Sequence, residues 1–79
     1  MIYPKYHPKF YHQDRWGSDR DWITVRMNAI PEDKQKEVAI QYERLFLSGA
    51  DDARKKANEY LHKTAKRYRD EKKTATQKP

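Results

Sequence analysis

The C-terminal third of the chain carries the densest group of side chains that could bind phosphate. Residues 51–79 hold ten basic and five acidic residues, so they contribute +5 to the formal net charge of +6. Cations grouped on one helix suit contacts to a phosphate backbone, and each contact adds to the salt dependence of binding. A solvated helix face with extended lysine side chains is the alternative interpretation. The predicted nucleic-acid contacts on this helix are Lys56, Lys63, Lys66, Arg67 and Arg69.

A second group lies in residues 1–17, where aromatic and basic side chains alternate. Stacking rings combined with cations are what single-stranded nucleic acid requires, and Lys5 and Lys9 are the predicted phosphate contacts here. Tyr and Trp also dominate the energetics of protein–protein interfaces, so a protein partner is an alternative. A third interpretation is that the rings cover the apolar seam of the helices, because the core is thin. The aromatic candidates for partner binding are Tyr3, Tyr6, Phe10, Tyr11 and Trp16.

Residues typical of metal binding and catalysis are sparse. His7, His12 and Asp14 are close in sequence, but a structural zinc site usually needs four ligands, and the chain contains no cysteine. Ser18 and Ser48 are predicted to cap or end helices rather than to act as nucleophiles. The two glycines do not provide a loop that cradles phosphate. We therefore expect no metal, no cofactor and no enzymatic activity.

Composition limits the elements that must position these groups. The chain has 79 residues, of which 35% are hydrophobic and 38% are charged. Typical soluble domains carry roughly 45–50% apolar and about 25% charged residues, so we expect one small domain with little core-forming material. The longest apolar runs, such as residues 45–47, cover only three residues, and no membrane span is expected. The lack of cysteine fits a reducing compartment, and we expect a cytoplasmic location.

Capping and spacing signals predict an all-α fold with three helices. Ser18 opens the first helix in a sequence that resembles a capping box, and Pro31 ends it. Acidic residues begin each of the next two helices, where negative charge suits the positive end of the helix dipole. Gly49 suits a left-handed position after the second helix. The three helices are expected at about residues 19–29, 32–47 and 51–72.

These helices are expected to bury one shared apolar seam. An extended aromatic arm over residues 1–17 precedes the three-helix domain of residues 18–73, and a frayed, flexible tail follows over residues 74–79. Ile40 and Leu47 lie seven residues apart and off the main face of their helix, so we expect them to contact the first helix or a second copy of the chain. The predicted seam consists of Trp22, Val25, Val38, Tyr42, Leu45, Phe46, Ala57, Leu61 and Tyr68.

Several short motifs carry a resemblance to a known group of proteins. They are Trp22-Ile23, Arg26-Met27-Asn28-Ala29-Ile30-Pro31, Val38-Ala39 with Tyr42, Ala53-Arg54-Lys55, Ala57-Asn58 and Tyr60-Leu61. Over about residues 21–69 the chain resembles small accessory proteins encoded by tailed, lambda-like phages of enteric bacteria. The resemblance implies a short helical protein that acts in the cytoplasm of a bacterial host. It brings no catalytic residues and does not include the aromatic arm.

Two functions from different classes follow from these patterns. The first is a small basic phage accessory protein that binds nucleic acid through the DNA or RNA backbone, with single strands included because the arm offers stacking rings. The second is a protein that binds and modulates or inhibits a host enzyme, with the N-terminal aromatics as anchors. The combination of positive charge and stacking rings favours the first.

Overall fold

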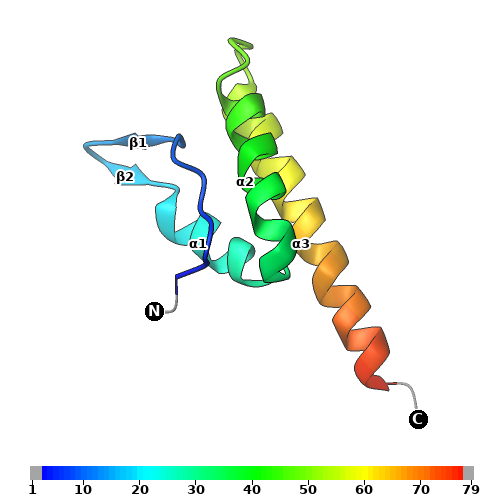
Figure 1. Ribbon diagram of the computed structural model, residues 1–79. Coiled ribbons are helices and arrows are strands. Elements are labelled where there is room, and N and C mark those ends of the chain that lie inside the picture. The colour runs from blue at the N-terminus through cyan, green and yellow to red at the C-terminus, as the bar shows by residue number, and fades with distance from the viewer. Residues whose placement is uncertain (1–2, 78–79) are drawn as a thin grey trace.

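The protein is mostly helical, as the sequence predicts. The computed structural model describes the backbone of residues 3–77 and the side chains of residues 3–71. Two long helices lie side by side in opposite directions, and a shorter helix packs against the second of them (Figure 1). The prediction of three helices is confirmed, while a small antiparallel hairpin that spans the predicted boundary between the arm and the helical domain was not foreseen. The elements are β1 (Gln13–Asp14), β2 (Gly17–Ser18), α1 (Arg20–Asn28), α2 (Glu32–Phe46) and α3 (Ala53–Gln77).

The start of α1 differs from the predicted capping box. Asp19 is the residue before the first helical turn, but its side chain caps no backbone N–H group of that turn. The Ser18 hydroxyl accepts the backbone N–H of Arg20 at 3.1 Å. The Asp19 carboxylate points toward α3 instead and binds Arg54. The predicted capping box does not form, because α1 begins one residue later than expected: Ser18 lies in β2, Asp19 holds the N-cap position, and the Ser18 hydroxyl reaches the N–H of Arg20 instead of that of Asp21.

The connection between α2 and α3 follows local signals in the sequence. Gly49 has a φ of +83°, the left-handed conformation predicted for it. Pro31 immediately precedes α2, and acidic residues occupy its first turn. α3 continues to Gln77, past the predicted start of the tail at residue 74, because no glycine or proline interrupts residues 74–77. Residues 78 and 79 of the predicted tail lie outside the described residues.

The core is smaller than the predicted seam and uses a different face of α1. Ile23, Met27 and Ile30 are buried, whereas Val25 is 55% exposed and Trp22 is partly buried. The predicted face of α1 also contained Arg26, and the neighbouring face is wholly apolar. Burial of the wholly apolar face leaves Arg26 only partly buried, so its guanidinium is desolvated less than it would be in the predicted core, and the assignment of Val25 to the core was wrong. The buried cluster consists of Ile23, Met27, Ile30, Val38, Ala39, Tyr42, Ala57 and Leu61.

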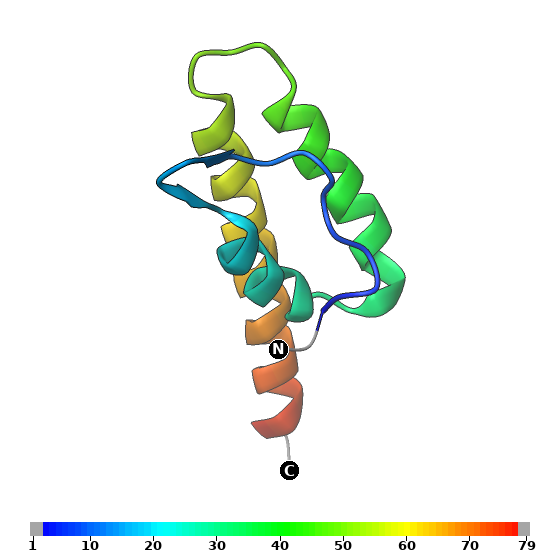
Figure 2. The ribbon, with the colours of Figure 1, turned by 90° about the vertical axis from the view of Figure 1, so that its left-hand side faces the viewer.

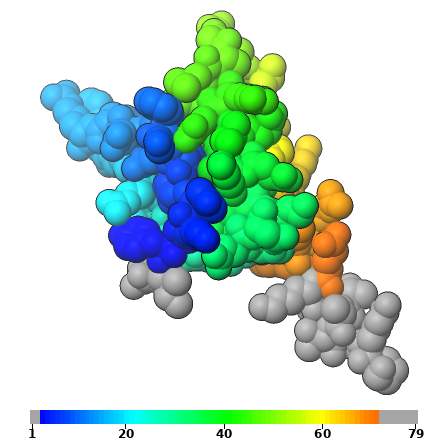
Figure 3. All heavy atoms as spheres, in the orientation of Figure 1, coloured from blue at the N-terminus to red at the C-terminus, as the bar shows by residue number. Residues whose placement is uncertain are grey.

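The N-terminal arm lies against α1 and α2, as Figures 2 and 3 show. The backbone N–H of Tyr6 donates to Gln35 Oε1 at 3.3 Å, and that of Lys9 donates to Glu43 Oε1 at 2.6 Å. Pro8 is fully buried. Among the rings of the arm, Tyr11 packs against the buried cluster. The expectation that the arm covers the seam therefore holds for part of it, while most of its rings face solvent.

Gln35 joins the arm, α1 and α2 at one point. Its Nε2 donates to the carbonyl oxygens of Met27 and Ile30, at 3.2 and 3.1 Å. Its Oε1 accepts the backbone N–H of Tyr6. Gln35 is buried, so these three bonds replace the water contacts that its amide group loses. One of them reaches the Met27 carbonyl oxygen in the last turn of α1, which also accepts the backbone N–H of Ile30, and another reaches the Ile30 carbonyl oxygen in the connection to α2.

Candidate functional site

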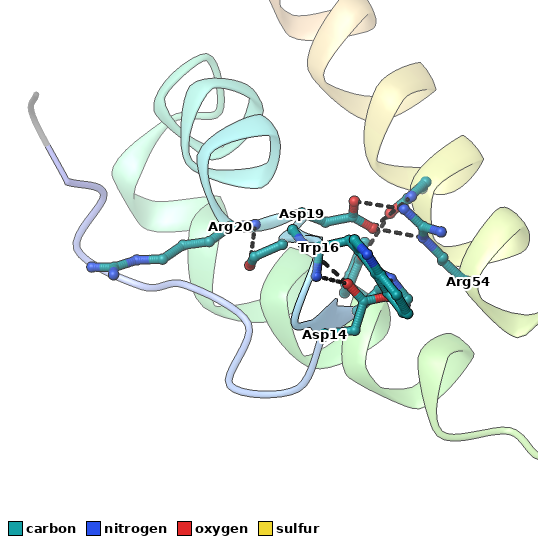
Figure 4. Close-up of polar contacts among 10 residues, drawn as sticks. Asp14, Trp16, Asp19, Arg20 and Arg54 are labelled. Atoms are coloured by element: carbon teal, nitrogen blue, oxygen red, sulfur yellow. Dashed lines mark hydrogen bonds and ion pairs between the residues drawn. The ribbon is translucent and has the colours of Figure 1, made fainter.

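The tip of the β1–β2 hairpin displays a tryptophan in an ordered turn. Asp14 Oδ1 accepts the backbone N–H groups of Trp16 at 2.9 Å and Gly17 at 3.0 Å (Figure 4). The hydrogen bond from Trp16 lowers the pKa of the Asp14 carboxyl below its usual range, and the bond from Gly17 adds to this. The Trp16 side chain is 80% exposed, and the Arg15 guanidinium carbon lies 4.3 Å from its ring centroid. The turn therefore holds a cation and a large ring together in solvent.

An ion pair anchors this hairpin beside the first turns of α3. Arg54 Nε and one terminal nitrogen each donate to an Asp19 carboxylate oxygen at 2.9 Å (Figure 4). Asn58 Nδ2 donates to the same carboxylate at 3.2 Å. The bond from Arg54 is the main cause that lowers the pKa of Asp19, whose side chain is only 14% exposed. The hairpin is thus held close to the helix that carries most of the basic residues.

This network continues into the core through Tyr42. The Tyr42 hydroxyl donates to Asn58 Oδ1, and the ring of Tyr42 is fully buried. Burial, followed by the nearby charge of Asp19, raises the pKa of Tyr42 to about 12. The hydroxyl therefore stays protonated at neutral pH and remains a donor. The side chains that position the hairpin are linked in this way to the packing of α2 against α3.

The outer face of α3 is exposed and rich in cations. All five basic residues predicted to contact nucleic acid on this helix are exposed. Two of them form ion pairs within the chain, since Lys56 lies 3.6 Å from Asp52 and Arg67 lies 3.3 Å from Glu71. These pairs connect residues four positions apart on an exposed helix, where such contacts contribute little to stability. Lys56 and Arg67 can therefore exchange their carboxylate partners for a phosphate.

Lys63, Lys66 and Arg69 differ from those two cations. Among the side chains of residues 3–71, no carboxylate lies within 4.0 Å of any of the three. Lys63 and Lys66 lie one turn apart on the side of α3 away from its buried residues. Glu59 and Asp70 share this face, four residues before Lys63 and four residues after Lys66, but neither forms an ion pair with these lysines. A lysine without a close ion-pair partner gives up no internal contact when it binds a phosphate. These residues are the strongest part of the predicted phosphate-binding surface.

The structure does not add the arm cations to this surface. Lys5 Nζ lies 3.2 Å from Glu32 Oε1 at the start of α2, and this contact raises the pKa of Lys5. The backbone of Lys9 is bonded to α2 as well. Tyr3 receives a bond from Arg20 of α1 at 3.1 Å. Residues 3–10 are therefore tied to α1 and α2, and of the predicted aromatic candidates only Trp16 lies in the hairpin anchored to α3.

The sequence did not single out Asp14, Asp19 or Arg54 for these roles. One signal for the hairpin was available, because Asp14 and Gly17 occupy the first and fourth positions of a four-residue segment, as in a common type I turn. No local signal links Asp19 to Arg54, which is 35 residues away.

The histidines near the N-terminus have protein partners rather than a shared centre. His7 Nε2 lies 3.2 Å from Thr24 Oγ1, and His7 Nδ1 lies 2.8 Å from the Pro8 carbonyl oxygen. His12 Nε2 lies 3.1 Å from Asp14 Oδ2. Within residues 3–71, no group of three or more histidine, cysteine, aspartate or glutamate side chains is placed to hold a metal ion.

Comparisons of the chain with protein-family models, with curated proteins and with solved structures found no match. The resemblance to phage accessory proteins accordingly stays a prediction from the motifs in the sequence. In the part of the chain that the structure describes, no helix is long and apolar enough to cross a membrane.

Proposed function

We propose that this protein is a non-enzymatic phage accessory protein that binds nucleic acid, with the outer face of α3 and the tip of the hairpin as its contact surface. The ligand is the backbone of DNA or RNA in single-stranded form. The lack of cysteine agrees with action in the reducing cytoplasm of a bacterial host. The residues proposed to contact the nucleic acid are Arg15, Trp16, Lys56, Lys63, Lys66, Arg67 and Arg69.

The observation that carries this proposal is the lack of carboxylate partners around Lys63 and Lys66 among residues 3–71. Because neither lysine is held in an ion pair among residues 3–71, a phosphate backbone would bind them without breaking an internal contact and would release its own bound counterions. Trp16 adds the second contribution, since an exposed ring next to a guanidinium offers a stacking surface for a base. The Asp19–Arg54 ion pair supports the combination of the two, because it ties the base of the hairpin to the first turn of α3.

The test is the affinity for a labelled single-stranded oligonucleotide, measured by fluorescence anisotropy over a range of salt concentrations. The variant Lys63→Glu with Lys66→Glu is expected to weaken binding and to flatten the slope of log K against log salt. Each phosphate contact on a single strand contributes about 0.7 to that slope, so the loss of two contacts lowers it by about 1.4. Trp16→Ala is expected to weaken binding while leaving the slope unchanged, because it removes stacking and no charge.

A matched control separates the α3 surface from net charge alone. Lys34→Glu with Lys36→Glu changes the net charge by the same amount on the exposed part of α2. If this control weakens binding as much as the α3 variant does, the proposed surface is wrong. If the wild-type protein retains no DNA or RNA at low salt, where electrostatic attraction is least screened, the function itself is wrong.

A protein partner is the second candidate, and the exposure of the arm supports it. Tyr3, Tyr6 and Phe10 stay in solvent although the arm lies along α2, and Ile40 and Leu47 are exposed apolar residues of α2 and its C-terminal end. Under this proposal a host enzyme, a phage protein or a second copy of the chain covers these rings. Tyr6→Ala with Phe10→Ala then abolishes partner binding in a folded protein, whereas the lysine variants leave it intact. Light scattering that gives a single monomer mass at all concentrations would exclude the second copy.

A further inference from the structure

Arg26 lies at the edge of the seam between α1 and α3, with its guanidinium against a tryptophan ring. Its guanidinium carbon is 4.1 Å from the centroid of the Trp22 ring. One of its terminal nitrogens donates to the Trp22 carbonyl oxygen at 3.3 Å. Its Nε is buried and has no hydrogen-bond partner among the described residues. The stacking and the single bond fix the direction of the planar group while leaving most of its hydrogen-bonding capacity unused.

Among the described side chains, this guanidinium has no acidic partner. Within residues 3–71, no carboxylate lies within 4.0 Å of Arg26. Two acids near this seam already have other partners, since Asp19 binds Arg54 and Glu71 binds Arg67. A half-buried charge without a counter-charge is costly, so a native structure that keeps one invites an explanation.

A second arginine lies close by, on α3. The contact between Asp19 and Asn58 marks the start of the seam. Arg26 comes seven residues after Asp19 and Arg69 comes eleven residues after Asn58, about two and three helical turns, so each arginine lies on the same side of its own helix as the residue of this contact. Burial, followed by the positive charge of Arg69, lowers the pKa of Arg26. Arg69 is exposed and likewise has no carboxylate partner among the described residues.

We propose that Arg26 and Arg69 together form a binding site for one phosphate group at the outer edge of the α1–α3 seam. Guanidinium groups match the oxygens of phosphate in geometry, and bonds between the two ions are among the stronger hydrogen bonds in proteins. A phosphate between the two side chains would replace their mutual repulsion by two attractions. The Trp22 ring holds one of the two guanidinium groups in position before the ligand arrives, so less conformational entropy is lost on binding.

This inference rests on the proposed function for its natural ligand, which is then a phosphodiester of the bound strand. Arg69 was predicted from the sequence as one of several cations on α3, and Arg26 was not. In this site Arg69 differs from Lys63 and Lys66, because Arg69 acts together with Arg26, whose guanidinium is held in position on α1. It also continues the contact surface from α3 onto α1.

The experiment uses the 15N-labelled full chain and follows the Arg26 Nε–Hε signal by NMR. Inorganic phosphate is added at constant ionic strength, with chloride as the replaced anion. A saturable shift at Arg26 is expected, and Arg69→Gln is expected to weaken phosphate binding about tenfold or more, which corresponds to one lost charge-assisted bond. Arg44→Gln removes one charge from the exposed face of α2 and serves as the matched control, with no expected change. Binding of a labelled single-stranded oligonucleotide is then measured with the same three proteins.

The combined results separate the site from the proposed function. A phosphate response that Arg69→Gln weakens, with a parallel loss of oligonucleotide affinity, supports both. A phosphate response without any oligonucleotide binding supports the site and overturns the claim that its natural ligand is a phosphodiester of a nucleic-acid strand. Oligonucleotide binding that Arg69→Gln leaves unchanged, with no phosphate response at Arg26, overturns the site and leaves the function standing. An equal loss in Arg44→Gln also overturns the site, since it shows a response to net charge only.

Discussion

The helix pair α2–α3 and the N-terminal segment of residues 3–19 are held in place by different kinds of contact. The pair buries Val38, Tyr42, Ala57 and Leu61 against each other and against α1. The segment contributes mainly hydrogen bonds and ion pairs, which link it to both ends of α2 and to α3. Apolar burial involves no titratable group and is not weakened by ionic screening, whereas ion pairs respond to both pH and ionic strength. The segment is therefore the part of the molecule that conditions and substitutions can release while the helix pair persists.

The largest effect is expected in the helix pair. Leu61→Ala leaves a cavity at a position with no exposure to solvent and should lower the free energy of unfolding by about 2–5 kcal/mol. Chemical denaturation followed by circular dichroism measures this loss. Val25→Ala is the control, because Val25 is an exposed residue of α1 and its truncation should change stability by less than about 0.5 kcal/mol. Equal losses in the two variants would contradict the position of the core.

The next effect is expected at the junction of the two regions. Gln35→Ala removes one amide that bonds Tyr6, Met27 and Ile30, and should cost about 1–3 kcal/mol because buried polar groups lose their partners. The arm should also lose protection against amide hydrogen exchange at Tyr6. Gln41→Ala, at a partly exposed position of the same helix, provides the comparison and should have a clearly smaller effect. A variant that keeps full protection at Tyr6 would show that the arm does not depend on this amide.

A smaller effect with a definite pH dependence is expected at Asp19. Its pKa is lowered in the folded protein, so its stabilising contribution is complete above the unfolded value of 3.8 and is lost as the pH falls through the folded value. Asp19→Asn should cost about 1 kcal/mol at pH 7, since solvent screens the half-exposed Arg54. Denaturation midpoints between pH 7 and pH 2 provide the measurement. The wild-type curve should approach that of Asp19→Asn at the acidic end, and parallel curves would refute the role of this ion pair.

The smallest effect is expected at the tip of the hairpin. Asp14→Ala removes the acceptor for the backbone N–H groups of Trp16 and Gly17. Hydrogen exchange at these two amides should become faster, and Trp16 should sample more orientations in solution. The free energy of unfolding should not change measurably, because the hairpin is exposed and contributes no residue to the buried cluster. A loss of global stability would show that the tip is coupled to the core.

The sequence predicts the helices better than it predicts how the N-terminal segment and α1 pack. The three helices depend on capping residues, prolines and apolar spacing, all of which act within a few positions. The choice between the Val25 face and the Ile23 face of α1 depends on what the rest of the molecule offers to cover, so local spacing could not decide it. Two-residue strands are too short to show an alternating pattern.

In the candidate site, too, some features follow from local sequence spacing and others depend on how distant segments pack. Exposure of Lys63 and Lys66 follows from their position opposite the buried stripe of α3, and the Lys56–Asp52 ion pair follows from a spacing of four residues. The stacking of Arg26 on Trp22 likewise follows from a spacing of four residues within α1, whereas the nearness of Arg26 to Arg69 depends on the packing of α1 against α3. The separation of Lys5 from the α3 surface depends on the path of the whole arm.

The ion pair between Asp19 and Arg54 also has a consequence for biosynthesis. The two residues are 35 positions apart, and synthesis at about 5–20 residues per second produces Arg54 roughly 2–7 s after Asp19. During this interval the aromatic N-terminal segment has been made and the helix that anchors its hairpin has not. Helix formation takes about a microsecond, so the wait is set by translation rather than by folding. The rings of this segment are then open to chaperones or to a binding partner before the protein has reached its final structure.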